Sequence, residues 1–191
     1  MPDCLNPVRQ ILAAARFAAE RHAAQRRKGR TAEPYVNHLL EVAELLARLT
    51  DELDTNLIVA ALLHDTIEDV GVSREEIAVR FGEDVAGLVA EVTDDKSLPK
   101  ETRKALQVEH AGGKSPRAQA LSAADKIANV RSIASSPPAN WSFERRVEYV
   151  RWARRVVAGF NHLDGRLAAE FQQLSAELQE WEKSGGTNDF F

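Results

Sequence analysis

Apolar residues recur at helical spacing along almost the whole chain, and this periodicity restricts the fold more than any other feature of the sequence. The segment 35–49 shows it most clearly, because its apolar side chains form a continuous stripe at helical spacing. Such a stripe is typical of a helix that packs one face against a core. The alternation of β-branched and polar residues that predicts strands is scarce. We therefore predict an all-α protein built as a helical bundle.

Helix ends are predicted from capping residues and from Gly and Pro. Asp54, Ser73 and Ser142 each precede an apolar periodic segment and suit the N-cap position. The predicted helices cover residues 8–24, 35–49, 55–66, 74–80, 83–91, 100–110, 116–134, 143–160 and 166–183. With 191 residues and no repeat or Pro-rich linker, the chain is predicted to form one domain over residues 1–183. Residues 184–191 are predicted to be a frayed tail.

The formal net charge of −4 excludes a general attraction to nucleic acid or to an anionic membrane. We therefore predict no DNA, RNA or membrane partner, and an anionic ligand would have to meet a local basic patch. No apolar run approaches the roughly 20 residues of a membrane-spanning helix, and residues 1–15 lack the pattern of a secretory signal. These features predict a cytoplasmic location, with which the single cysteine, Cys4, agrees. The sequence is compatible with a homo-oligomer and does not define the oligomeric state.

Histidine and aspartate residues stand within or at the ends of apolar segments, where a helix can deliver them to a buried site. His38 begins one apolar segment, the pair His64-Asp65 ends another, and Asp125 lies inside the apolar stretch 120–130. Two imidazoles and two carboxylates suit a divalent cation such as Mn²⁺, Fe²⁺ or Zn²⁺, and the hard oxygen ligands favour Mn²⁺. The absence of nearby thiols argues against a structural zinc site.

The acidic residues also have simpler interpretations. A charged carboxylate at Asp125 would be costly to bury without a partner. Metal coordination would relieve that cost, and so would a salt bridge to Lys126 or Arg131. Two further acids, Glu68 and Asp69, form either part of a site or the solvated end of a core helix.

The order of a histidine, a His-Asp pair and a distant aspartate resembles that of the HD-domain phosphohydrolases, an all-α superfamily. The surrounding residues sharpen the resemblance. In chain order they are Arg26-Arg27-Lys28, Pro34-Tyr35-Val36-Asn37-His38, Ala61-Leu62-Leu63-His64-Asp65-Thr66-Ile67-Glu68-Asp69, Val92-Thr93-Asp94-Asp95-Lys96 and Ala124-Asp125-Lys126 with Asn129 and Arg131. Together they resemble the hydrolase domain of the RelA/SpoT family over about residues 14–160, which is most of the chain.

This resemblance implies a bundle of the HD-domain type and a defined activity. The family's hydrolase domain removes the 3′-diphosphate of guanosine tetra- and pentaphosphate, (p)ppGpp, in a Mn²⁺-dependent reaction that releases pyrophosphate and GDP or GTP. The chain has no room for synthetase and regulatory domains, so it is similar to the stand-alone small hydrolases of the metazoan SpoT homologue type. The implied partner is (p)ppGpp or a related phosphorylated nucleotide, and the implied cofactor is Mn²⁺ or another divalent ion.

The resemblance also assigns roles residue by residue. The positions that match metal ligands are His38, His64, Asp65 and Asp125. Those that match the acidic pair credited with positioning or activating water are Glu68 and Asp69, and those that match substrate contacts are Arg27, Lys28, Asn129 and Tyr149. A carboxylate near the ligands can accept a proton from water, and a substrate with two diphosphates needs a local cluster of cations. The basic run over residues 21–30 would otherwise be a solvated helix end.

Two positions depart from the family pattern, and two other functions stay open. Ser122 stands where many relatives have a lysine, and Ala128 where many have a larger residue, so both are expected to thin the pocket wall or its positive charge. The same site would serve a phosphatase for another 2′- or 3′-phosphorylated nucleotide, such as NADPH. A nucleotide-binding module without turnover is the remaining alternative. His22, His110 and His162 match no ligand position and are expected to be packed or at the surface.

Overall fold

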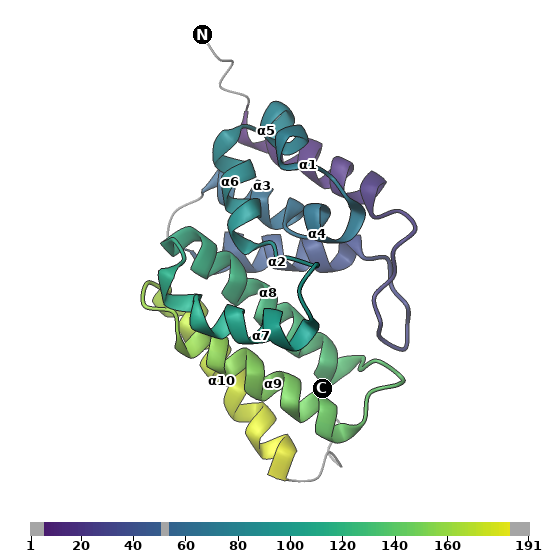
Figure 1. Cartoon of the computed structure of the whole chain (residues 1–191), viewed down its shortest axis with the longest axis vertical. Coiled ribbons are helices and arrows are strands. Elements are labelled where there is room, and N and C mark those ends of the chain that lie inside the picture. The colour runs from purple at the N-terminus through teal and green to yellow at the C-terminus, as the bar shows by residue number, and fades with distance from the viewer. Residues whose placement is uncertain (1–5, 51–53, 184–191) are drawn as a thin grey trace.

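The computed structural model describes residues 6–50 and 54–183 of the protein (Figure 1). Within these ranges the chain forms ten α-helices and one short 3₁₀ helix, with two isolated β-bridges and no strand. The elements are α1 (Pro7–Arg21), α2 (Val36–Leu49), α3 (Thr55–Leu63), α4 (Thr66–Val70), α5 (Arg74–Phe81), α6 (Glu83–Val92), α7 (Lys100–Glu109), η1 (Ala111–Gly113), α8 (Pro116–Ser135), α9 (Phe143–Ala158) and α10 (Gly165–Lys183).

The all-α prediction is confirmed by this arrangement, and most predicted helices differ from the observed ones by no more than two residues at either end. The predicted tail at 184–191 and Cys4 lie outside the described residues, and the one-domain boundary stays a prediction. No helix within the described ranges is long and apolar enough to cross a lipid bilayer.

Two helices form the centre of the bundle. α3 is surrounded by α1, α2 and α6, and each of its residues from Leu57 to Leu63 is buried. Its uniformly apolar sequence suits this position, because a helix that is hydrophobic all round is buried on every side. α8 packs against α2, α6, α9 and α10. Figure 1 shows α8 between the N-terminal helices and the layer of α7, α9 and α10. The candidate ligands lie where α2, α3 and α8 meet.

The end of α3 differs from its prediction. The sequence predicts helix as far as Thr66, but α3 ends at Leu63, and a turn at His64 and Asp65 precedes α4. Two side chains explain the break, because they occupy carbonyl oxygens that a continuing helix would use. His64 Nδ1 lies 2.8 Å from the Ala61 carbonyl oxygen, and Thr66 Oγ1 donates to the Leu63 carbonyl at 2.6 Å. The turn therefore presents His64 and Asp65 together.

Capping side chains define the other helix boundaries near the site. The predicted N-caps Asp54, Ser73 and Ser142 are confirmed, since each accepts a hydrogen bond from a backbone N–H of the first turn, at 3.0, 3.1 and 3.3 Å respectively. Gly71 ends α4 in the left-handed conformation, with φ of 69°, which glycine adopts at little cost. α4 therefore ends at Val70 and is a short helix directly after the turn at His64 and Asp65.

The loop over residues 22–35 connects α1 to α2, because α1 ends at Arg21 and not at the predicted residue 24. This loop lies against the segment that follows α8, where Gly29 forms an isolated bridge with Pro138. A Cβ atom at Gly29 would stand 2.5 Å from the Ser136 carbonyl oxygen, so the close approach requires glycine. The contact holds the basic residues 26–28 beside the C-terminal end of α8.

Candidate metal centre and active-site groove

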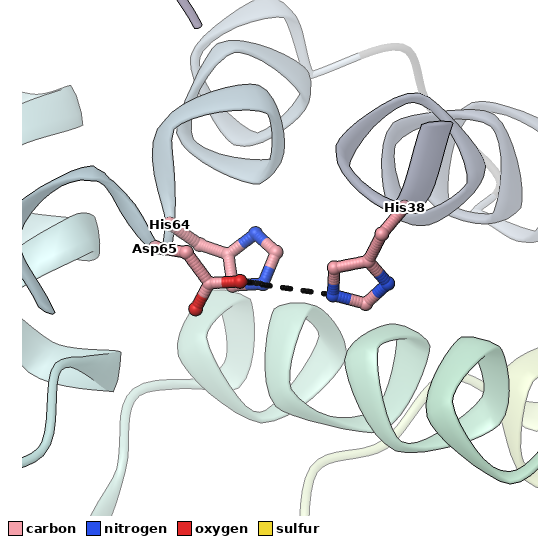
Figure 2. A group of neighbouring side chains, drawn as sticks. All are labelled: His38, His64 and Asp65. Atoms are coloured by element: carbon pink, nitrogen blue, oxygen red, sulfur yellow. Dashed lines mark ion pairs between the residues drawn. The ribbon is translucent and has the colours of Figure 1, made fainter. Parts of the chain in front are cut away.

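Four side chains that are distant in the sequence converge where α2, α8 and the turn after α3 meet. His38 Nε2 lies 3.2 Å from Asp125 Oδ1 and 3.7 Å from Asp65 Oδ2. His64 Nε2 lies 3.1 Å from Asp65 Oδ2 and 3.7 Å from Asp125 Oδ1. Figure 2 shows the two imidazoles and the Asp65 carboxylate turned toward one another, and their ligand atoms all lie within 4.8 Å of one another. One ion can therefore contact these three residues, and the Asp125 Oδ1 atom lies within 3.7 Å of both imidazoles.

The surroundings of His64 support an ion at this point. Because His64 Nδ1 lies 2.8 Å from the Ala61 carbonyl, it carries the proton and leaves Nε2 as the ligand atom. His64 Nε2 is buried and makes no hydrogen bond within the described part of the chain, which is uncommon for a buried polar atom. Burial opposes a charge on His64, but Asp65 and Asp125 outweigh it and hold its pKa well above its usual value. The cluster thus attracts a cation, and its donor set fits a divalent metal ion.

Asp125 has a salt-bridge partner, yet one of its oxygen atoms still faces the histidines. Its Oδ2 lies 3.0 Å from Nζ of Lys126, one of the two partners considered from the sequence. The other, Arg131, pairs with Glu170 instead. The Oδ1 atom accepts a hydrogen bond from Asn129 Nδ2 at 2.6 Å and faces the imidazole of α2. The salt bridge therefore pairs with Oδ2, whereas Oδ1 is directed at the imidazole, where a metal ion would contact it.

Glu68 and Asp69, predicted as the acidic pair, lie in α4 directly after the ligand turn. Glu68 Oε1 is 3.4 Å from Nη1 of Arg103 and 3.8 Å from Nζ of Lys96. Asp69 lies 2.7 Å from the Lys96 ammonium and accepts a hydrogen bond from Gln25 Nε2 at 2.8 Å. Both carboxylates are 21% exposed. The structure therefore holds them between cations and donors of other elements, whereas a solvated helix end would leave them free.

Glu68 also has an altered proton affinity. Burial, together with the negative charges of Asp65 and Asp94, raises the pKa of Glu68 above its usual value. A carboxylate whose pKa is raised toward neutrality holds a transferred proton better than an exposed one. A raised pKa beside the candidate ligands is what a general base needs, and the catalytic role of Glu68 stays a prediction.

A groove with a volume of about 610 Å³ reaches Glu68 and Asp69. All of the predicted substrate contacts line it, namely Arg27, Lys28, Asn129 and Tyr149. Further cations in its wall are Arg26, Lys96, Lys100, Arg103, Lys104 and Arg145. Because the chain as a whole is acidic, this local excess of cations makes the groove the place where a polyanion would bind.

Two parts of the groove were not predicted from the sequence. Lys100, Arg103 and Lys104 stand at positions i, i+3 and i+4, so they share one face of α7, and this spacing is a signal that could have identified them. The ring of Trp141 also lines the groove, and the Arg145 guanidinium lies 4.6 Å from its centroid. An aromatic ring next to cations suits a nucleotide, whose base stacks and whose phosphates pair with positive charge.

The two departures from the family pattern have different outcomes. Ser122 lines a smaller cavity beside the candidate ligands. Ala128 is fully buried in the hydrophobic core and does not line the groove. The expectation that Ala128 thins the pocket wall stays a prediction, because the burial of an alanine does not show what a larger side chain would do at this position.

Comparison with known proteins agrees with this geometry. The sequence matches the HD domain family over residues 14–156, a range that contains all four candidate ligands. The chain belongs to the HD-domain family. Its cluster of two histidines and two aspartates therefore lies within the matched HD domain, which strengthens its interpretation as a metal site.

Several relatives carry the name of an enzyme activity. A Xenopus tropicalis protein named guanosine-3′,5′-bis(diphosphate) 3′-pyrophosphohydrolase MESH1 is 48% identical over 164 residues, which cover 86% of this chain and 92% of the relative. The human protein of that name is 44% identical over 165 residues, with the same two coverages. An Aquifex aeolicus protein named guanosine-3′,5′-bis(diphosphate) 3′-pyrophosphohydrolase is 36% identical over 90% of this chain but over only 23% of its own length.

A solved HD-domain structure matches the fold. It is described as a metazoan orthologue of SpoT that hydrolyses ppGpp, and it superimposes with a TM-score of 0.84 and 38% sequence identity. The match covers 93% of this chain and 96% of the other. The predicted bundle of the HD-domain type is thereby confirmed.

Tyr35 supports the HD-domain site in a way that the sequence analysis did not assign. Its hydroxyl donates to Asp65 Oδ2 at 2.6 Å. Its ring stacks on that of His22, with centroids 5.2 Å apart, and meets the ring of His38 edge-on at 5.5 Å. Burial, with Asp65 nearby, raises the pKa of Tyr35, so the phenol keeps its proton and stays a donor. Tyr35 therefore orients one candidate ligand, Asp65, and packs against another, His38.

Replacing Tyr35 with phenylalanine is expected to weaken metal binding by about 10-fold to 100-fold, because outer-shell hydrogen bonds orient the ligands. A calorimetric titration of the metal-free protein with the ion measures the metal affinity. Tyr149→Phe is the matched control, since its ring lies in the groove and not against a candidate ligand. Unchanged metal affinity in Tyr35→Phe would refute the supporting role.

Proposed function

We propose that the protein is a Mn²⁺-dependent hydrolase that removes the 3′-diphosphate of (p)ppGpp. The observation that carries this proposal is the position of the cluster, in which two imidazoles and two carboxylates adjoin the half-buried Glu68 at a cationic groove of about 610 Å³. The names of the HD-domain relatives point to the same reaction. The oxygen-rich donor set favours Mn²⁺ over softer ions.

The reaction consumes one water molecule. The water oxygen bonds to the phosphorus attached at ribose O3′, the P–O3′ bond breaks, and O3′ takes up a proton, so the products are pyrophosphate and GDP or GTP. His38, His64, Asp65 and Asp125 would hold the ion. When bound, a divalent ion lowers the pKa of water and offsets the negative charge of the phosphate.

Residues of the chain itself would handle the proton and the substrate. Glu68 accepts the proton of the attacking water, and its raised pKa suits that role. Asp69, held by Gln25 and Lys96, orients the water. The substrate contacts in this proposal are Arg27, Lys28, Asn129 and Tyr149, joined by the cations of α7 and by Arg145. Arg27 donates to Asn129 at 3.2 Å, so the two are already positioned together.

The activity is tested by incubating the purified protein with ppGpp and Mn²⁺. Pyrophosphate and GDP are expected in equal amounts, and a chelator should stop their release. Absence of pyrophosphate under these conditions would refute the proposal. Orthophosphate released from NADPH would indicate the phosphatase alternative, and tight binding of ppGpp without turnover across several divalent ions would indicate a binding module. The cytoplasmic location and the lack of nucleic-acid partners stay predictions from the sequence.

A further inference from the structure

A second, smaller cavity of about 70 Å³ adjoins the candidate metal cluster. His64, Asp65 and Asp125 line it, whereas none of these three lines the large groove. Glu68 and Gln107 line both spaces and so stand between them. The volume exceeds the roughly 10–15 Å³ that a single water needs, yet it is far below that of the groove. The small cavity therefore accepts a group of the size of one phosphate and not a nucleoside.

The wall of this cavity contains an ammonium group that forms no salt bridge with the described residues. Lys114 Nζ donates to the Glu91 carbonyl oxygen at 2.5 Å. No carboxylate oxygen of the described residues lies within 4.0 Å of it. The nearby Glu91 carboxylate is occupied by Ser115, whose backbone N–H and hydroxyl donate to it at 2.6 and 2.8 Å. The positive charge of Lys114 is thus available to an anion in the cavity.

The backbone of Lys114 is held in place by its surroundings. Its carbonyl oxygen accepts a hydrogen bond at 2.8 Å from Nε2 of Gln119, a fully buried side chain. Ser115, the next residue, is the N-cap of α8. A charge positioned in this way before the ligand arrives costs little ordering entropy on binding. Burial lowers the pKa of Lys114, Glu91 opposes this effect and Lys126 adds to it, so an anion in the cavity would stabilise the charged form.

Lys126 and Ser122 complete the polar lining. Lys126 Nζ lies 3.0 Å from Asp125 Oδ2 and 4.9 Å from the ring centroid of Trp152. Ser122 precedes Asp125 by three residues on α8, so its hydroxyl lies on the same face of the helix. The carboxylates that also line the cavity are Glu68, Asp65 and Asp125, and the last two are assigned to the ion. Two ammonium groups and a hydroxyl are a suitable lining for a phosphate.

We propose that this cavity binds the terminal phosphate of the substrate's diphosphate and so distinguishes a diphosphate ester from a monophosphate ester. The inference rests on the proposed function. The attacked phosphorus must lie at the metal cluster, and the nucleoside needs the large groove. The second phosphorus is one bridging oxygen away, and the small cavity is lined by three of the four candidate ligands and adjoins the groove at Glu68 and Gln107. A site built to pair with a group discriminates against a ligand that lacks it.

The test compares pyrophosphate with orthophosphate as probes. Equilibrium dialysis of the radiolabelled anions against Mn²⁺-loaded protein measures binding without any need for turnover. Lys114→Met is expected to weaken pyrophosphate binding about 10-fold to 100-fold, the effect of one charged hydrogen bond, and to change orthophosphate binding much less. Lys114→Arg should restore most of the pyrophosphate affinity. Ser122→Leu, which fills the cavity without a change of charge, should act like Lys114→Met.

Two controls separate this cavity from the groove. Lys183→Met removes an exposed lysine at the end of α10 and should leave both affinities unchanged. Lys28→Met removes a groove cation and should lower kcat/KM for ppGpp and for guanosine 5′-diphosphate 3′-monophosphate by the same factor. Lys114→Met should lower kcat/KM for ppGpp alone.

The outcomes distinguish the two proposals. If Lys114→Met and Ser122→Leu fold and bind pyrophosphate as the wild type does, the cavity proposal is overturned. It is also overturned if these variants are active but their kcat/KM falls by the same factor for the diphosphate and the monophosphate substrate. If the wild type does not hydrolyse ppGpp, but its pyrophosphate affinity still depends on Lys114, the proposed function fails and the cavity stands as a site for a terminal phosphate.

Discussion

Replacing Asp125 with alanine is expected to remove the bound metal and the hydrolytic activity together. Its Oδ1 atom lies within 3.7 Å of both imidazoles, so the change deletes a ligand that faces the whole cluster. Metal ions contribute several kcal/mol to catalysis of this type, which corresponds to a loss of about 1,000-fold or more in rate. Elemental analysis of gel-filtered protein and an assay of pyrophosphate release measure the two effects.

The folding of this variant needs a separate check, because the alanine also leaves the buried Lys126 ammonium without its carboxylate. Asp125→Asn keeps the shape of the side chain and should show the same loss with normal thermal unfolding. Glu109→Ala, at an exposed position at the end of α7, is the control and should behave as the wild type. A variant at Asp125 that retains one metal per chain and the normal rate would show that the ligand assignment is wrong.

Replacing Glu68 with glutamine is expected to spare the metal and to lower kcat by about 100-fold to 10,000-fold, the usual contribution of a general base. The amide has nearly the same shape, and the cluster of ligands stays intact. It cannot accept a proton from water, however. Metal content by elemental analysis and kcat under saturating ppGpp test the two parts of this expectation.

Asp125→Ala is expected to lose metal and activity together, whereas Glu68→Gln is expected to lose activity alone, so the two variants separate a ligand from a base. Glu109→Gln, an exposed residue at the end of α7, is the matched control and should keep the full rate. If Glu68→Gln loses metal as well as turnover, Glu68 acts as a ligand and not as a base. If it keeps the normal rate, another group must take the proton, and Asp69 would be the next residue to replace.

Helical periodicity was sufficient to predict most of the fold, because both central helices have local signals. α3 is apolar all round, and α8 begins at Pro116 directly after its N-cap Ser115, two residues that suit a helix N-terminus. The candidate ligands could be predicted for a related reason. His64-Asp65 and Asp125 are polar residues in apolar segments, and such residues need a partner when buried.

The contacts between distant segments could not be predicted in this way. The hydroxyl of Tyr35 reaches Asp65, and the amide of Gln25 reaches Asp69, through the packing of a loop against α4. Nothing in the local pattern of residues 22–35 indicates these partners. The break after Leu63 was missed because the carbonyl oxygens that end the helix are taken by side chains of otherwise helix-compatible residues. Periodicity describes the face that a residue occupies and not the partner it meets.

The candidate ligands come from α2, from α8 and from the turn after α3, which are separate segments of the chain. A bound ion would therefore act as a non-covalent cross-link between helices. Because it would bind the folded chain and not the unfolded one, linkage adds about 2.7 kcal/mol to the folding free energy when the free metal is 100 times its dissociation constant. The supply of metal in the cell would then determine how much of the protein is folded as well as how fast each molecule works.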